Sequence, residues 1–137
     1  MIKIAVVDDH QQVRETWHFI LSTNKAFEVV AKCRNGQEAI EVAGRLRPDV
    51  FLMDINMEPI NGIEATETIT RLYPDIKIIA MSIHMEAAYV RRMMQAGASA
   101  YVTKNSSYQE VFDAVTLVYE GGEYICKEVQ IKSTAVS

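Results

Sequence analysis

The sequence predicts an α/β fold, a doubly wound five-stranded parallel sheet in the order 2-1-3-4-5 with five helices. Short runs rich in valine and isoleucine recur along the chain, and segments with helical periodicity separate them. This alternation is typical of βαβ units, and runs that are almost continuously apolar are typical of parallel strands buried on both faces. Because crossovers between parallel strands are right-handed, the sheet is expected to wind in two directions.

The predicted strands are the apolar runs at residues 2–7, 27–33, 50–53, 76–82 and 98–103. The first helix follows from Val13, Trp17, Ile20 and Leu21 at i, i+4, i+7 and i+8. The last helix follows from Val111, Ala114, Val115 and Val118 at i, i+3, i+4 and i+7. The other three helices are predicted over residues 37–47, 63–73 and 86–95.

Proline and glycine mark the ends of four of these helices. Pro48 and Pro74 follow the second and third helices, and Gly97 and Gly121 stand where a helix end favours a left-handed residue. In the predicted order, strands one and three are neighbours, and the winding reverses between them. Ligands of such sheets bind outside the carboxyl ends of the strands at that point, so functional residues are expected there.

The composition is that of one ordinary globular domain. The 137 residues are 49% hydrophobic and 23% charged, with 6 Gly and 3 Pro, and this length does not fit a second full domain. The net charge of -4, with no basic cluster larger than the pair Arg91 and Arg92, argues against direct nucleic-acid binding by this chain.

Cysteine usage and hydropathy bear on the compartment. Cys33 and Cys126 lack the spacing of metal ligands and the context of a disulfide framework, so we predict free thiols in a reducing compartment. The sequence shows neither a secretory leader nor an apolar run near the ~20 residues that span a bilayer. A soluble, cytoplasmic protein without a membrane partner is therefore expected.

Carboxylates follow two of the strands that should be neighbours. Asp8 and Asp9 come directly after the first strand, and Asp54 comes directly after the third. Like charges this close need a cation to stay ionised, and an all-oxygen site suits a hard divalent ion that keeps several waters. The sequence therefore predicts a Mg²⁺ site at this edge of the sheet.

A hydroxyl and an ammonium complete the predicted site. Ser82 ends the fourth strand and Lys104 follows the fifth. Facing a carboxylate cage with Mg²⁺, these groups are suited to hold the oxygens of a phosphoryl group, and Asp54 would be the nucleophile that forms an acyl phosphate. Each residue alone also has an ordinary explanation as a helix cap or a solvated surface charge. The prediction depends on four of five strands carrying a suitable polar group at the same end.

These positions resemble the receiver domains of bacterial two-component response regulators, which have a flavodoxin-like, CheY-like fold. VVDDHQQVRETW resembles the first strand with its acidic pair, and DINMEPINGIEAT resembles the phosphoacceptor loop. AMSIH carries the family's Ser/Thr in Ser82, and AYVTK carries its Lys in Lys104. The resemblance spans Met1 to about Gly122, so it implies a receiver domain over 1–122 and a linker or C-terminal tail over 123–137.

The resemblance implies roles for the site residues. Asp54 would accept a phosphoryl group from a sensor histidine kinase or phosphotransfer protein. The metal would be bound directly by Asp9 and Asp54, through water by Asp8, and by the backbone carbonyl of Asn56. Ser82 and Lys104 would bind the phosphoryl oxygens. Only self-phosphorylation and slow autodephosphorylation are expected, not turnover as an enzyme.

Three further positions have roles in the family. Tyr101 would be a switch aromatic that rotates from solvent into the interior and remodels the face built from the fourth helix, fifth strand and fifth helix. It could instead serve only as packing. Asn56 and His84 stand where the family tunes the lifetime of the acyl phosphate, although His84 could also be an exposed loop residue.

Two positions depart from the family pattern. Glu58 stands where proline is common four residues after the phosphoacceptor, with Pro59 next, so a local backbone shift is expected. Asn105 stands where a proline often follows the lysine. Neither departure removes a group that the chemistry needs.

The stretch GASAYVTKNSSYQEVFDAVTLVYEGGEYI resembles receivers of transcriptional regulators with a LuxR-type helix-turn-helix. The residues after Glu123 are too few for such a domain, so DNA binding would need a C-terminal domain absent from this chain. A stand-alone receiver that docks to a partner protein is the alternative. Homodimerisation on phosphorylation is an expectation from the family.

Two other classes of function compete with this prediction. Phosphohydrolases of the haloacid dehalogenase type also use an Asp nucleophile beside Mg²⁺, but they need a second Asp two residues later, where this chain has Asn56. A pseudo-receiver that is never phosphorylated is the other possibility, and the intact set of acidic, hydroxyl and lysine residues argues against it.

Overall fold

The computed structural model describes residues 1–57, 61–84 and 86–129. A parallel sheet in the order β2-β1-β3-β4-β5-β6 forms the centre of the molecule. Its strands are β1 (Ile2–Val7), β2 (Phe27–Cys33), β3 (Val50–Asp54), β4 (Lys77–Ser82), β5 (Ala100–Thr103) and β6 (Tyr124–Ile125). The helices are α1 (Gln11–Ser22), α2 (Gly36–Leu46), α3 (Gly62–Leu72), α4 (Ala87–Ala96) and α5 (Tyr108–Tyr119).

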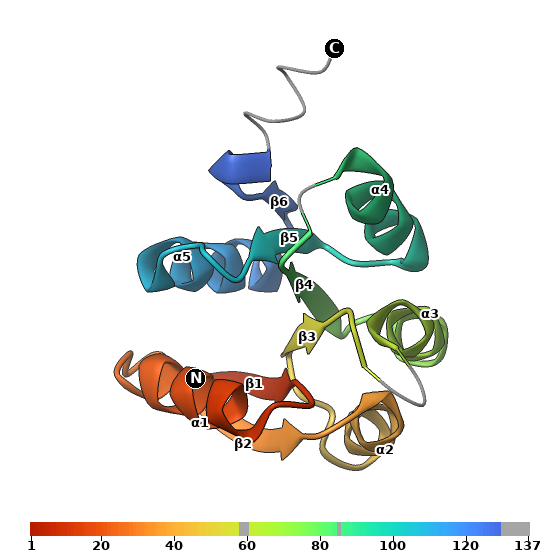
Figure 1. Cartoon of the computed structure of the whole chain (residues 1–137). Helices are drawn as coiled ribbons and strands as arrows, with labels where there is room; N and C mark the ends of the chain where they lie inside the picture. The colour runs from red at the N-terminus through yellow and green to blue at the C-terminus, as the bar shows by residue number, and fades with distance from the viewer. Residues whose placement is uncertain (58–60, 85, 130–137) are drawn as a thin grey trace.

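The helices cover both faces of the sheet. Figure 1 shows α1 and α5 on one face and α2, α3 and α4 on the other. The predicted class and the order of the first five strands are confirmed, and the winding reverses between β1 and β3. No helix among the described residues is long and apolar enough to cross a membrane.

The predicted count of five strands and five helices was wrong. β6 adds to the edge of β5 in parallel, with Tyr124 opposite Ala100 and Ile125 opposite Tyr101. Residues 127–129 are helical as well, within the segment expected to be linker or tail. A two-residue strand is too short to give a periodic signal in the sequence.

Short polar and glycine signals set the helix ends. The side chains of Asn35, Asn61 and Ser107 cap α2, α3 and α5 by accepting from the backbone N–H three residues later. Gly97 and Gly121 have φ of 116° and 96°, which confirms their predicted left-handed conformation. The caps fix where each helix begins and therefore how the loops at the sheet edge are held.

The core lies on both faces of the central strands. All five residues of β3 and most of β1 and β4 are buried, as their continuous apolar sequences predict. Trp17 from α1 packs into the same core. Cys33 and Cys126 are both buried free thiols, and burial raises the pKa of Cys33 to about 12, so this thiol stays protonated at neutral pH.

Gly62 lies where α3 passes close to the end of β3. Its N–H donates to the carbonyl oxygen of Ile55 at 2.8 Å. A Cβ at this position would lie 2.1 Å from the carbonyl oxygen of Asp54 and 2.8 Å from the Cα of Ile55. Both contacts are with backbone, which cannot move aside by changing a rotamer.

We predict that Gly62→Ala lowers the free energy of unfolding by at least about 2 kcal/mol, because the added methyl group forces α3 away from β3. Urea denaturation measures this change. Gly44→Ala is the matched control, since its Cβ would meet only the hydroxyl end of the Tyr73 side chain, at 2.7 Å. An alanine inside α2 also favours the helix, so the control should stay within about 1 kcal/mol of the parent. Equal losses in both variants would contradict the proposed clash.

Candidate functional site

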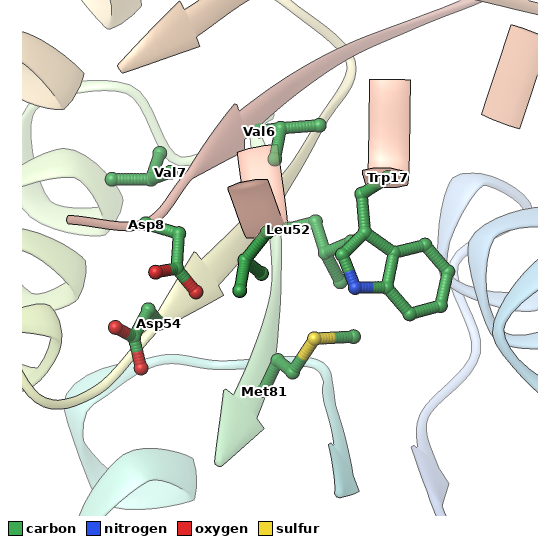
Figure 2. Close-up of a pocket in the computed structure, with 8 residues that line it drawn as sticks. Val6, Val7, Asp8, Trp17, Leu52, Asp54 and Met81 are labelled. Atoms are coloured by element: carbon green, nitrogen blue, oxygen red, sulfur yellow. The ribbon is translucent and has the colours of Figure 1, made fainter. Parts of the chain in front are cut away.

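The predicted site residues come together at the carboxyl ends of four neighbouring strands. Asp8 follows β1, Asp54 ends β3, Ser82 ends β4 and Lys104 follows β5. Figure 2 shows the carboxylates of Asp8 and Asp54 side by side, with Leu52, Met81 and the Trp17 ring on the other side of the pocket. The side chains of Asp8 and Asp54 are only 4% and 2% exposed. Two carboxylates are therefore buried together against an apolar wall.

Lys104 lies between these two carboxylates. Its Nζ is 3.2 Å from Oδ2 of Asp8 and 3.6 Å from Oδ1 of Asp54. The backbone N–H of Lys104 donates to the carbonyl oxygen of Ser82 at 2.9 Å, which holds the lysine at the end of β4. One ammonium group offsets only one of the two buried negative charges, so the pocket keeps an excess of negative charge.

Burial and, after it, the neighbouring Asp8 raise the pKa of Asp54 to about 6. The Lys104 ammonium and the N–H of Asn56 act in the opposite direction. This N–H donates to Oδ1 of Asp54 at 3.3 Å. Asp54 is thus a carboxylate whose charge is costly in the free protein and is favoured by any added cation.

Asp9 lies in a second cluster beside Asp8, and this cluster includes His10. Nδ1 of His10 is 2.9 Å from Oδ1 of Asp9 and 3.1 Å from Oδ1 of Asp8. The ligand atoms of these three residues all lie within 4.8 Å of one another. His10 is not among the predicted site residues, although its position directly after the acidic pair is a usable signal.

Asp8 is held from two further directions. The backbone N–H of His10 donates to its Oδ1 at 2.9 Å, and Nη1 of Arg14 donates to its carbonyl oxygen at 2.7 Å. The loop after β1 is therefore fixed by the first turn of α1. The side chain of Asn56 is exposed, while its N–H is directed at Asp54.

Ser82, His84 and Tyr101 form a continuous hydrogen-bonded path away from the carboxylates. The N–H of His84 donates to Oγ of Ser82 at 3.0 Å, and the hydroxyl of Tyr101 donates to the carbonyl oxygen of His84 at 2.7 Å. Ser82 and Tyr101 are both 0% exposed, so the Tyr101 ring occupies its inward position. The His84 ring stacks on Tyr89 of α4, with centroids 4.1 Å apart.

The two departures from the family pattern have different outcomes. Asn105 is exposed in a turn that the N–H of Ser106 closes by donating to the carbonyl oxygen of Thr103 at 3.0 Å. This turn carries Lys104 to the carboxylates without a proline. Glu58 and Pro59 lie outside the described residues.

The chain belongs to the response regulator receiver domain family, whose model matches residues 4–116. Members of this family are signalling proteins of two-component systems. The pocket of acidic, hydroxyl and lysine residues at the carboxyl edge of the sheet lies within the matched region.

Curated relatives of the chain include a transcriptional regulatory protein and another response regulator. The chain is 42% identical over 128 residues to the transcriptional regulatory protein DegU of Brevibacillus brevis, covering 93% of this chain and 54% of the relative. It is 40% identical to the response regulator GacA of Pseudomonas syringae, covering 94% of this chain and 60% of the relative. The chain thus spans little more than half the length of these relatives.

Solved structures share the same fold. A LuxR-family response regulator from Aurantimonas sp. SI85-9A1 superposes with a TM-score of 0.92 at 29% identity, covering 98% of both chains. The response regulator domain of Thermotoga maritima CheB gives a TM-score of 0.83 at 29% identity, covering 88% of this chain and 97% of that one. The first of these similarities extends over β6 as well.

We predict that, with EDTA present, Asp54→Asn raises the free energy of unfolding at pH 7.5 by about 1–3 kcal/mol. The folded pKa of Asp54, about 6, is above its ordinary value of 3.8, so folding favours the protonated acid. The stability from that proton is fully present below pH 3.8 and is lost as the pH rises through 6. The advantage of the Asn variant should therefore shrink toward pH 4.

Chemical denaturation of both proteins across this pH range tests the prediction. Asp75→Asn serves as the control, because it removes an exposed carboxylate just before the amino end of β4. We expect no comparable gain in the free energy of unfolding for this variant. If the Asp54→Asn variant is no more stable than the parent at pH 7.5, the buried charge of Asp54 does not lower the free energy of unfolding.

Proposed function

We propose that this chain is a phosphoacceptor signalling switch in which Asp54 takes a phosphoryl group from a sensor histidine kinase or phosphotransfer protein. The proposal depends on one observation, the position of the Lys104 ammonium between two buried carboxylates. Its Nζ lies 3.2 Å from Oδ2 of Asp8 and 3.6 Å from Oδ1 of Asp54. A buried nucleophile, a second acid and an ammonium are the groups that phosphoryl transfer to a carboxylate requires. Family membership supports this function.

The donor set of the pocket fits Mg²⁺. The candidate ligands are the carboxylates of Asp8, Asp9 and Asp54 and the backbone carbonyl of Asn56, which are all hard oxygen donors. Burial and the neighbouring Asp8 raise the pKa of Asp54, which means that its negative charge is not fully compensated in the pocket. An added cation would compensate it. When bound, the ion would neutralise the carboxylates and the charge that develops on the phosphoryl oxygens. His10 would have to release Asp8 and Asp9 from its present contacts.

The residues of the chain would carry out the transfer as follows. A carboxylate oxygen of Asp54 attacks phosphorus, and the P–N bond to the donor histidine breaks as the acyl phosphate forms. The leaving imidazole keeps the electron pair of that bond. Lys104 Nζ moves from Asp8 to a phosphoryl oxygen, and the Ser82 hydroxyl donates to another. Asn56 and His84 flank the product and would set how fast water reaches it.

The output would pass through Tyr101. Ser82 and Tyr101 are joined by the backbone of His84, so a phosphoryl group that fixes Ser82 also favours the inward ring. The face of α4, β5 and α5 would then present one surface to a partner. Because the relatives include transcriptional regulators, this surface would control a DNA-binding domain outside this chain or mediate a homodimer. A stand-alone receiver that docks to a protein is the alternative.

We predict that acetyl phosphate with Mg²⁺ adds one phosphate to the chain and that Asp54→Asn abolishes this addition, because Asp54 is the proposed nucleophile. Intact-mass spectrometry at neutral pH measures the product, and EDTA should suppress its formation. Asp75→Asn keeps the pocket unchanged and should be labelled like the parent.

Three outcomes would contradict the proposed function. Phosphate that persists in the Asp54→Asn variant would place the acceptor elsewhere. Steady turnover of a generic phosphate ester above ~1 s⁻¹ would indicate a phosphohydrolase instead of a switch. A chain that stays unlabelled with Mg²⁺ and excess acetyl phosphate would favour a pseudo-receiver.

A further inference from the structure

The segment after α5 is built into the edge of the sheet. The N–H of Tyr124 donates to the carbonyl oxygen of Ser99 at 3.0 Å, and the N–H of Cys126 donates to that of Tyr101 at 2.9 Å. Cys126 and Val129 are 0% and 1% exposed. Residues 124–129 lie beyond the part of the chain that the family model matches, yet four of them belong to the core or pack against it.

Two polar side chains anchor this segment. The carboxylate of Glu110, in the first turn of α5, accepts hydrogen bonds from the Tyr124 hydroxyl and from the N–H of Lys127, the latter at 2.9 Å. The hydroxyl of Thr103, at the end of β5, donates to Oε2 of Glu128 at 2.8 Å. Bonds to a carboxylate are stronger than those between neutral groups, so these contacts fix the segment in one register.

The strand that receives the segment also carries the groups of the site. Thr103 directly precedes Lys104, which contacts both buried carboxylates. Tyr101 accepts the bond from Cys126 with its backbone and donates to His84 with its hydroxyl. Tyr101 is therefore held by its ring on one side, and its carbonyl oxygen holds residues 124–129 on the other. Loss of the bond to His84 would remove one of the contacts that hold Tyr101 at this edge of β5.

We propose that residues 124–129 form a latch on the edge of β5, anchored by Glu110 and Thr103, and that its attachment depends on the hydrogen bond that the inward Tyr101 ring donates to His84. The partner of this edge is the chain's own C-terminal segment. The latch sets the direction in which the chain leaves the sheet after β6. Amide hydrogen exchange at Tyr124 and Cys126 reports whether the latch is attached to β5.

The anchor is tested by residue-resolved amide hydrogen exchange on the full chain. Glu110→Gln should speed exchange at Lys127 by about five- to tenfold, because the Lys127 N–H donates directly to this side chain and a neutral amide accepts the bond more weakly. Exchange at Tyr124, whose N–H is bonded to Ser99, should rise as well, because its hydroxyl loses the carboxylate that anchors it. Glu123→Gln removes the same charge from an exposed neighbouring side chain and should leave these rates unchanged. Unchanged rates in Glu110→Gln, with protection of β1 and β3 intact, would overturn the anchoring role.

The dependence on Tyr101 is tested in the same way, without phosphorylation. Tyr101→Phe keeps the ring and removes the bond to His84, so exchange at Cys126 should rise about fivefold. Tyr108→Phe is the matched control, since the Tyr108 ring is 60% exposed, and Cys126 should not respond to it. Equal rates at Cys126 in Tyr101→Phe and the parent would overturn the coupling.

A third comparison rests on the proposed function. Mg²⁺ and acetyl phosphate should slow exchange at Cys126 in the chain that mass spectrometry shows to be phosphorylated, because the inward ring is favoured. Asp54→Asn should show no change. Faster or equal exchange in the phosphorylated chain would overturn the coupling to the site. A chain that takes up no phosphate would contradict the proposed function, while the two variant comparisons would still decide whether the latch exists.

Discussion

The sharing of one lysine ammonium by two buried carboxylates is the constraint on which the functional part of the structure depends. Asp8 and Asp54 lie side by side because the winding reverses between β1 and β3, which makes their carboxyl ends neighbours. Lys104 offsets one charge and leaves the other. The apolar core holds the strands together. The protein therefore stays folded although the uncompensated negative charge at this end of the sheet is unfavourable.

The path from this edge into the protein is short and consists mainly of backbone. His84 joins Ser82 to Tyr101 through its N–H and its carbonyl oxygen, while its ring stacks on Tyr89 at the start of α4. A change at Ser82 therefore reaches a strand and a helix through one residue. These backbone groups remain in every variant except proline, so other substitutions at His84 alter mainly the contact of its ring with α4.

Much of the fold and of the site could be predicted, because local sequence patterns indicate where each strand ends and how the strands follow one another. Continuous apolar runs indicated the buried strands, and the polar residue after each run had to lie at the carboxyl edge. The sixth strand could not be predicted, since two residues carry no periodicity and their pairing is set by β5 and by Glu110. His10 was missed because its contacts with Asp8 and Asp9 arise from the loop conformation. The inward Tyr101 likewise depends on tertiary packing.

β6 covers the N–H and C=O groups along the edge of β5. An uncovered edge of a parallel sheet is a template on which strands of other molecules can add, and this is a common route to aggregation. The two residues of β6 pair with Ala100 and Tyr101 and so shield this part of the β5 edge from such addition. A version of the chain cut before Tyr124 would keep its pocket residues but would leave this edge of β5 open to such addition.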